Sequence, residues 1–202
     1  VAAASIATEV TARRRVVVSI AAGIRIADLA RWLGAGVPLV RTMPNRPALI
    51  GAGITAACAG EHVTAEERAA VEQALSTAGP LVWLDDESLM DAVTAVSGSG
   101  PAYFFLLIEA LEDAGAALGL PRDTARRLAV HTALGAGRMA AEGPDDPATL
   151  REQVTSRGGT TAAALAVLEA AGLRGTVAAA VAAAARRSAE LADESHHPPR
   201  GR

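Results

Sequence analysis

The chain has 202 residues, of which 50% are hydrophobic and only 2% aromatic, and its formal net charge is −3. This length suits one large domain or two small ones, with a core built from Ala, Leu and Val. The slightly negative charge excludes a broad basic field for nucleic acid. A single cysteine, Cys58, excludes an internal disulfide. The sequence also lacks the run of about 18 purely apolar residues that would indicate a membrane span. We therefore expect a cytoplasmic protein that binds neither nucleic acid nor membrane.

The first part of the chain alternates helical and strand patterns. It begins at Val1 rather than at Met, inside a helical pattern over residues 1–12, and we interpret it as a fragment. A β-branched run at residues 16–20 is typical of a strand buried on both faces, and Thr64 with Glu67 forms a capping box that begins a helix. Further strands are predicted at 37–43, 54–59 and 81–84, and a further helix at 24–33. This alternation predicts an α/β layer, the trailing part of a doubly wound, Rossmann-type sheet.

Only helical patterns follow Asp85. The SGSGP segment at residues 97–101 is interpreted as a capping loop before a buried helix, with Pro101 as its first residue. Residues 193–202 are polar and rich in Pro, and we expect them to be disordered. Helices are predicted up to residue 96, at 101–118, 121–141 and 147–154, from 159 onward, and at 173–191. The predicted fold class is α/β plus all-α, with segments 1–85, 86–192 and 193–202.

The most informative segment is Ser156-Arg157-Gly158-Gly159-Thr160-Thr161, in which a glycine pair begins a helix. The amides of a first helical turn lack intrahelical acceptors, and the helix dipole adds partial positive charge there. Glycines let a ligand approach the backbone closely, and three hydroxyls add hydrogen-bonding groups. The pattern is typical of a site for a small anion such as a carboxylate. An ordinary glycine-rich helix cap explains the bare pattern equally well.

The sequence around this segment resembles a known family signature. PATLREQVTSRGGTTAAALAVLE, residues 147–169, resembles the signature of pyrroline-5-carboxylate reductases in the order and spacing of Leu150, Val154, Thr155, Ser156, Gly158, Gly159, Thr161, Ala164, Leu165, Leu168 and Glu169. Four more segments follow the family order, namely VSIAAGI (18–24), RTMPNRPALIGAG (41–53), AVTAVSGSGPAYFFLLIEAL (92–111) and AGLRGTVAAAV (171–181). The resemblance therefore covers residues 16–191.

The resemblance implies an oxidoreductase of proline biosynthesis. Members of the family transfer a hydride from NADPH or NADH to 1-pyrroline-5-carboxylate, giving L-proline, and form intertwined homodimers that often assemble further into rings. It implies that residues 1–85 are the C-terminal part of a Rossmann-like NAD(P)-binding domain and that residues 86–192 are a helical dimerisation and substrate domain. Neither the resemblance nor the spacing of His62, His131, His196 and His197 implies a metal site.

Site residues follow from the same resemblance. It implies that Ser156, Gly159, Thr160 and Thr161 hold the substrate carboxylate, with Thr161 as a candidate catalytic proton donor to the ring nitrogen. It places the nicotinamide end of the cofactor against Ile20, Ala21, Ala22, Pro44 and Asn45, just past strand ends, where open α/β sheets bind ligands. Spacing alone favours ordinary turns there. The sequence departs from the family at Arg157, usually Pro, and at Arg46, usually small or aliphatic.

Two other interpretations stay open. No G-x-G-x-x-G turn for a pyrophosphate lies near the start, because Gly51-Ala52-Gly53 follows the wrong element and Gly135-Ala136-Gly137 lies within a helix. The chain would then be a catalytically incomplete fragment that acts only as a helical dimerisation module. A related dehydrogenase of hydroxy acids is disfavoured, because those enzymes usually carry a catalytic Lys and this chain has none.

Overall fold

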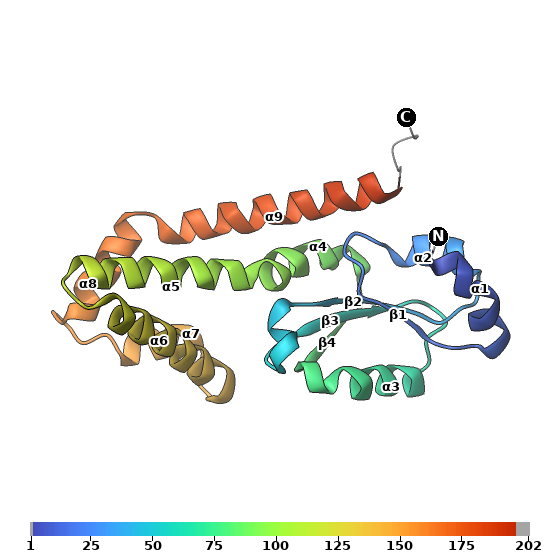
Figure 1. Cartoon of the computed structure of the whole chain (residues 1–202), viewed down its shortest axis with the longest axis horizontal. Helices are drawn as coiled ribbons and strands as arrows, with labels where there is room; N and C mark the ends of the chain where they lie inside the picture. Colours follow the sequence, from blue (N-terminus) through green and yellow to red (C-terminus); the bar gives the residue numbers. More distant parts are fainter. Residues whose placement is uncertain (1, 197–202) are drawn as a thin grey trace. The chain divides into compact units, whose positions relative to one another are not determined.

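The computed structural model describes residues 2–196 and consists of two compact units (Figure 1). The first unit comprises Val1–Pro101 together with Ala180–Arg202, and the second comprises Ala102–Ala179. Two long helices, α5 (Gly100–Ala117) and α9 (Leu173–His196), contribute residues to both units. The predicted functional division at residue 85 stays a prediction, since compactness divides the chain elsewhere.

A four-stranded sheet forms the centre of the first unit (Figure 1). Its strand order is β1-β2-β3-β4, with β1–β2 and β3–β4 parallel and β2–β3 antiparallel. The elements in chain order are α1 (Ala2–Arg13), β1 (Val17–Ser19), α2 (Ile26–Leu33), β2 (Leu39–Pro44), η1 (Arg46–Ile50), β3 (Thr55–Ala59), α3 (Ala65–Leu75), η2 (Ser76–Ala78), β4 (Leu81–Leu84), η3 (Glu87–Leu89), α4 (Met90–Val93) and the π-helical turn η4 (Thr94–Gly98). All four predicted strands are therefore present.

The antiparallel pairing of β2 with β3 follows from their short connection, which holds only η1. A parallel pair would need a crossover of about a dozen residues or more, usually with an α-helix. Asn45 Oδ1 accepts a hydrogen bond from the backbone amide of Ile54 at 3.0 Å and so closes this connection. Close backbone packing also requires glycine at position 53 in this connection, because a Cβ on Gly53 would lie 2.6 Å from Ala48 N. The sheet is thus mixed rather than purely parallel.

The expectation that the first strand is buried on both faces was wrong. β1 spans only three residues, and it lies at the edge of the sheet, paired with β2 alone. The side chain of Val18, in its middle, is 37% exposed. A continuous apolar run does not distinguish a central strand from an edge strand, because that difference depends on which other strands pair with it.

Helices cover both faces of the sheet, and the alternation of side chains along each strand decides which helix each residue meets. On one face Val40 and Ala57 pack with Val71 of α3. On the other face Ala56 and Cys58 pack with Met90 of α4. A third cluster joins the first two helices to the sheet edge through Val10, Leu29, Leu33, Val37 and Leu39. The predicted capping box at Thr64 is confirmed, with the hydroxyl accepting from Glu67 N at 3.2 Å.

The predicted capping loop at residues 97–101 was also wrong. These residues continue the helix from η4 into α5, so that the helical run Glu87–Ala117 is uninterrupted. Within it Ser99 N donates to Thr94 O at 2.8 Å, the i→i+5 bond of a π turn. Glycine and serine near a proline indicated a loop, but the hydrogen bonds of the wider turn keep these residues helical. The helix that follows is not buried within the chain, since Phe104, Phe105, Leu106 and Leu107 are exposed.

The second unit is entirely helical among the residues described. It contains most of α5, the helices α6 (Arg122–Glu142), α7 (Pro147–Gln153) and α8 (Thr160–Ala170), and the first turns of α9. A doubly bonded ion pair holds α5 to α6, because Arg126 Nε and Nη2 donate to the two carboxylate oxygens of Glu112 at 2.9 and 3.1 Å. Residues 193–196, expected to be disordered, form the end of α9, and 197–202 lie outside the described residues.

Candidate functional site

The carboxyl ends of β1 and β2 lie at the same edge of the sheet, because the two strands are parallel, with Ser19 opposite Arg41. The hydroxyl of Thr42 donates to the carbonyl of Ser19 at 2.9 Å and fixes the end of β1 against β2. Ile20, Ala21 and Ala22 follow directly, and Pro44 ends the neighbouring strand. The structure therefore brings the two predicted cofactor-binding segments together at one edge.

The turn after β1 presents small and apolar side chains to solvent. Ala21 and Ala22 are exposed, and Ile20 is 67% exposed. Pro44 and Asn45 are half-buried, and the Asn45 side-chain oxygen is already occupied by Ile54 N. This edge offers accessible backbone and an apolar surface without bulky obstruction. Such a surface fits the flat, partly apolar end of a nicotinamide nucleotide.

The predicted carboxylate site lies in the second unit, at the start of α8. Gly159 is the residue before the helix, and no side chain among the described residues caps it. Its amide donates to Ser156 O at 3.0 Å, so a tight turn brings Ser156 beside the first amides of the helix. Ser156 and Thr160 are exposed and Thr161 is half-buried. Amides and hydroxyls therefore converge on an accessible helix start, where an anion is stabilised by the helix dipole.

Two glycines shape this turn for different reasons. Gly158 has a φ of +72°, a left-handed conformation that costs an L-residue about 1–2 kcal/mol. Gly159 has an ordinary φ of −81°, but a Cβ there would collide with the Ser156 hydroxyl oxygen. The pair thus sets both the direction of the chain and the position of that hydroxyl.

The preceding helix, α7, is fixed by its own N-cap. Asp146 Oδ1 accepts hydrogen bonds from the amides of Ala148 at 2.8 Å and Thr149 at 3.0 Å. These amide hydrogen bonds lower the pKa of the Asp146 carboxyl, because they stabilise the carboxylate. Just past the end of α7 at Gln153, the Thr155 hydroxyl donates to Arg151 O at 2.5 Å. Asp146 was not among the predicted site residues, but the helix that the sequence predicts to begin at Asp146-Pro147 is confirmed.

The two groups of predicted residues belong to different compact units: residues 20–22 and 44–45 to the first, and residues 156–161 to the second. The two arginines that depart from the family pattern, Arg46 and Arg157, are both exposed. His131 is exposed as well. Within residues 2–196, no three His, Cys, Asp or Glu side chains gather as metal ligands would.

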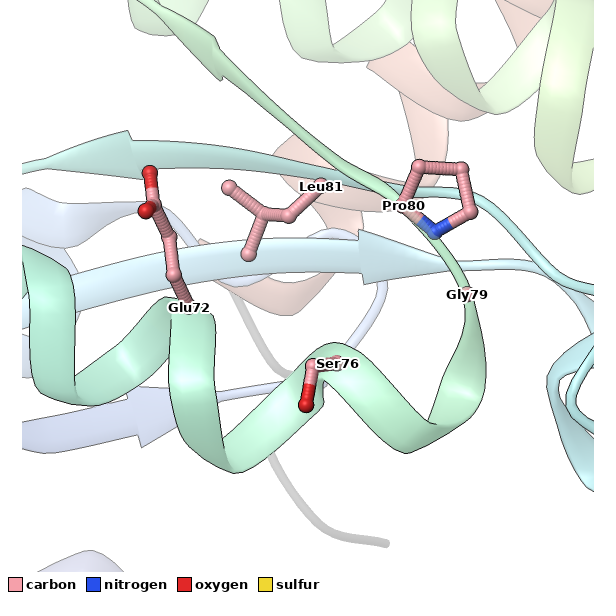
Figure 2. Close-up of a pocket in the computed structure, with 5 residues that line it drawn as sticks. All are labelled: Glu72, Ser76, Gly79, Pro80 and Leu81. Carbon is pink, nitrogen blue, oxygen red and sulfur yellow. The ribbon is translucent and has the colours of Figure 1, made fainter.

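None of the predicted site residues lines a surface cavity of about 450 Å³. It is lined by Glu72, Ser76, Gly79, Pro80 and Leu81, between the end of α3 and the start of β4 (Figure 2). Its polar groups already have partners within the chain. Glu72 accepts from Trp83 Nε1 at 2.5 Å, and Ser76 donates to Gln73 O at 2.8 Å. The cavity therefore offers no free set of converging polar groups.

Known proteins resemble this chain in sequence over nearly its whole length. The family described as "Pyrroline-5-carboxylate reductase dimerisation" matches residues 87–191, just over half of the chain. The chain belongs to the pyrroline-5-carboxylate reductase family. The predicted family resemblance is thereby confirmed, and the apolar helical run Glu87–Ala117 falls wholly within the matched region.

Curated pyrroline-5-carboxylate reductases show how much of the family's length is present. The Pseudomonas aeruginosa protein is 52% identical over 180 residues, which cover 89% of this chain and 66% of the relative. The Corynebacterium melassecola protein is 49% identical, and the match covers 87% of this chain and 65% of the relative. The chain thus spans just under two thirds of the length of these reductases.

Solved pyrroline-5-carboxylate reductase structures share the fold. The Coxiella burnetii protein is 38% identical with a TM-score of 0.91, and the match covers 94% of this chain and 70% of that one. A Plasmodium falciparum pyrroline carboxylate reductase with NADP bound is 32% identical with a TM-score of 0.83, covering 94% and 75%. The predicted fold class, part of a Rossmann-type sheet followed by a helical domain, is confirmed.

Proposed function

We propose that this chain provides the substrate site and part of the cofactor site of a pyrroline-5-carboxylate reductase. The reaction moves a hydride from NADPH or NADH to the C=N carbon of 1-pyrroline-5-carboxylate and adds a proton, drawn ultimately from solvent, to the ring nitrogen, giving L-proline and the oxidised nucleotide. The observation that carries the proposal is the α8 start, where the turn closed by Gly159 N and Ser156 O brings the Ser156 hydroxyl beside the first helical residues, Thr160 and Thr161. These residues belong to the segment that resembles the family signature, which supports the proposal.

The nucleotide supplies the hydride, and the chain's own residues position it. The exposed turn Ile20-Ala21-Ala22 and the end of β2 at Pro44-Asn45 receive the nicotinamide end. Small side chains at this edge let the ring approach the backbone closely, and the exposed Ile20 side chain gains contact with it. The NADP bound to the Plasmodium falciparum relative supports the nucleotide class.

The α8 start binds and orients the substrate. Its carboxylate accepts from the amides of Thr160 and Thr161 and from the hydroxyl of Ser156, and the helix dipole compensates its charge. The Gly159 amide, predicted to join them, instead donates to Ser156 O and shapes the turn. An anchored carboxylate fixes the ring, which makes the approach of hydride effectively intramolecular. The half-buried hydroxyl of Thr161 is the proposed proton donor to the ring nitrogen. A protonated imine carbon is electrophilic enough that the site needs no strong base.

A reductase assay with matched variants tests this proposal. The purified chain is incubated with NADPH and 1-pyrroline-5-carboxylate, and both NADPH oxidation and L-proline are measured. The double variant Ser156→Ala/Thr161→Ala is expected to raise the substrate KM by about tenfold or more, because it removes the Ser156 hydrogen bond to the carboxylate and the Thr161 hydroxyl proposed to contact the ring nitrogen. Glu61→Ala, at an exposed site of the first unit, serves as the control. Unchanged substrate affinity in the double variant would reject the site.

A second candidate function is helical association without catalysis, and the exposed apolar surface of α5 favours it. Phe104, Phe105, Leu106 and Leu107 are all exposed, and a group of large apolar side chains open to solvent is typical of a protein–protein interaction site. We propose that a second copy of the chain covers it in a homodimer, with larger rings as a further assembly. Light scattering with NADPH titration separates the candidates: a dimer without NADPH binding supports association alone. A dimer that binds NADPH and forms proline supports the reductase, and we expect it to act in the cytoplasm.

A further inference from the structure

The end of α9 carries contacts that the proposed function does not use. Residues 180–196 of this helix belong to the same compact unit as the sheet. Two side chains in this stretch are buried, Ser188 at 7% and Ala192 at 2% exposure, whereas most of α9 is exposed. They are four residues apart and so lie on one face of the helix. This face contacts two different parts of the sheet unit.

Ser188 fixes the helix to α4. Its hydroxyl donates a hydrogen bond of 2.7 Å to Asp91 Oδ1, although the two residues are 97 positions apart in the chain. A hydrogen bond to a carboxylate at a largely buried hydroxyl is stronger than one between neutral groups. This bond therefore determines where the last turns of α9 lie against the sheet unit.

Ala192, one helical turn further on, lies on the turn between β1 and α2. Gly23 in that turn is buried and has a φ of +75°. A Cβ on Gly23 would lie 3.4 Å from the backbone N and Cα atoms of Ala192. Arg25 Nη2 also lies 2.9 Å from Asp193 Oδ1, but both side chains are largely exposed and this ion pair contributes little. Helix α9 thus closes one side of the turn, while Ala21 and Ala22 on the same turn remain open to solvent.

We propose that Ser188 and Ala192 are positioning residues for the nicotinamide-binding turn Ile20-Ala21-Ala22. The inference rests on the proposed function of that turn. The hydrogen bond from Ser188 to Asp91 fixes the position of α9. The backbone of Ala192 then packs against Gly23 on the buried side of the turn, so that its exposed side keeps one conformation. The family match to the dimerisation region extends to Leu191. The helix that carries the end of that region therefore also sets the cofactor turn.

Hydrogen exchange of the intact chain tests the proposal without catalysis. In Ser188→Ala, the amides of residues 20–25 are expected to exchange about tenfold faster or more, because the loss of a hydrogen bond to a carboxylate lets the turn open locally. Amides of β3 and β4 in the same unit should keep their wild-type rates. Asp91→Asn retains an acceptor oxygen and should keep most of the wild-type protection of residues 20–25. Asp91→Ala has no acceptor and should exchange as fast as Ser188→Ala. Glu190→Ala, an exposed site on α9, is the matched control.

Three outcomes overturn the positioning role: unchanged exchange at residues 20–25, an equal increase in β3 and β4, or the same effect from Glu190→Ala. If Ser188→Ala does not fold, Ala192→Gly loosens the α9 backbone where it faces Gly23 and is judged by the same comparison. NADPH titration of the same variants separates this inference from the proposed function. Faster exchange of the turn with unchanged NADPH affinity would keep the positioning role and reject the cofactor role of the turn.

Discussion

Arg41 and Glu87 form an ion pair in the interior of the first unit, with Arg41 Nη1 2.8 Å from Glu87 Oε1. The same carboxylate oxygen accepts a hydrogen bond from the backbone amide of Ile26 at 2.9 Å. One side chain of η3 thereby joins the centre of β2 to the first turn of α2. Because the Arg41 side chain is only 7% exposed, the Glu87 carboxylate, rather than water, compensates its positive charge.

We expect Glu87→Ala to destabilise the chain by about 3 kcal/mol, because it leaves a buried guanidinium and a helix-start amide without their acceptor. Urea unfolding followed by circular dichroism measures this loss. The double variant Arg41→Met/Glu87→Leu removes both charges and should recover most of it. Glu61→Ala, at an exposed position, should change stability by less than about 0.5 kcal/mol. A loss below about 1 kcal/mol in Glu87→Ala would contradict this role of the ion pair.

Cys58 is expected to be unreactive in the folded chain. It is buried between β2, β4 and α4, and burial, with a smaller contribution from the Glu87 carboxylate, raises the pKa of its thiol. Since only the thiolate is nucleophilic, labelling at pH 8 should be at least about tenfold slower in native buffer than in urea. The rate is measured with a chromogenic disulfide reagent. Rapid, complete labelling of the native chain would show that this part of the core opens.

Asp146 gives a pH-dependent prediction for the segment that precedes the substrate loop. Its folded pKa lies below the ordinary value of 3.8, so its cap contributes stability above that pH and loses it as the pH falls through the folded pKa. Carbon-detected NMR titration of the carboxyl should report the lowered pKa. Asp146→Asn keeps a capping oxygen but should remove this part of the acid dependence of α7. An Asp146 carboxyl that titrates at or above 3.8 would disprove the cap as described.

Gly158 and Gly159 are expected to respond differently to the same substitution. Gly158→Ala should lower stability by about 1 kcal/mol, because alanine resists a positive φ. Gly159 has an ordinary φ, so Gly159→Ala should lower stability less than Gly158→Ala does. The added methyl group must, however, displace the Ser156 hydroxyl. Ligand affinity should therefore fall more in Gly159→Ala than in Gly158→Ala. Unfolding in urea and titration with L-proline measure the two effects, and the reverse ranking in affinity would contradict the assigned geometry.

Local sequence signals predicted many of the helices and strands. Thr64 and Glu67 fixed the start of α3, and the strand at residues 81–84 was predicted with the bounds observed. Long-range pairing was harder to predict. The exposure of Val18 depends on the strand order, and the antiparallel direction of β3 depends on how η1 closes its loop through Asn45. Neither follows from the residues of the element itself.

The candidate site was likewise predictable only where its sequence signal is local. The glycine pair and hydroxyls at residues 156–161 were visible because a helix start has a local sequence signal. The supporting contacts were not, since Ser188 and Asp91 are distant in the chain and each is an ordinary surface-type residue. The continuation of the helix through residues 97–101 was missed because Gly, Ser and Pro also fit a loop. Only the wider π-helical hydrogen bonding distinguishes the two.

Carboxylate binding at the start of α8 is tested most directly by NMR. The backbone amide signals of Gly159, Thr160 and Thr161 are followed while the chain is titrated with L-proline or with L-prolinamide, which has the same ring but no carboxylate. We expect saturable shifts of these three amides with L-proline, little change with L-prolinamide, and weaker L-proline binding in Ser156→Ala/Thr161→Ala. Equal shifts with both ligands, or L-proline shifts confined to other residues, would contradict the substrate site.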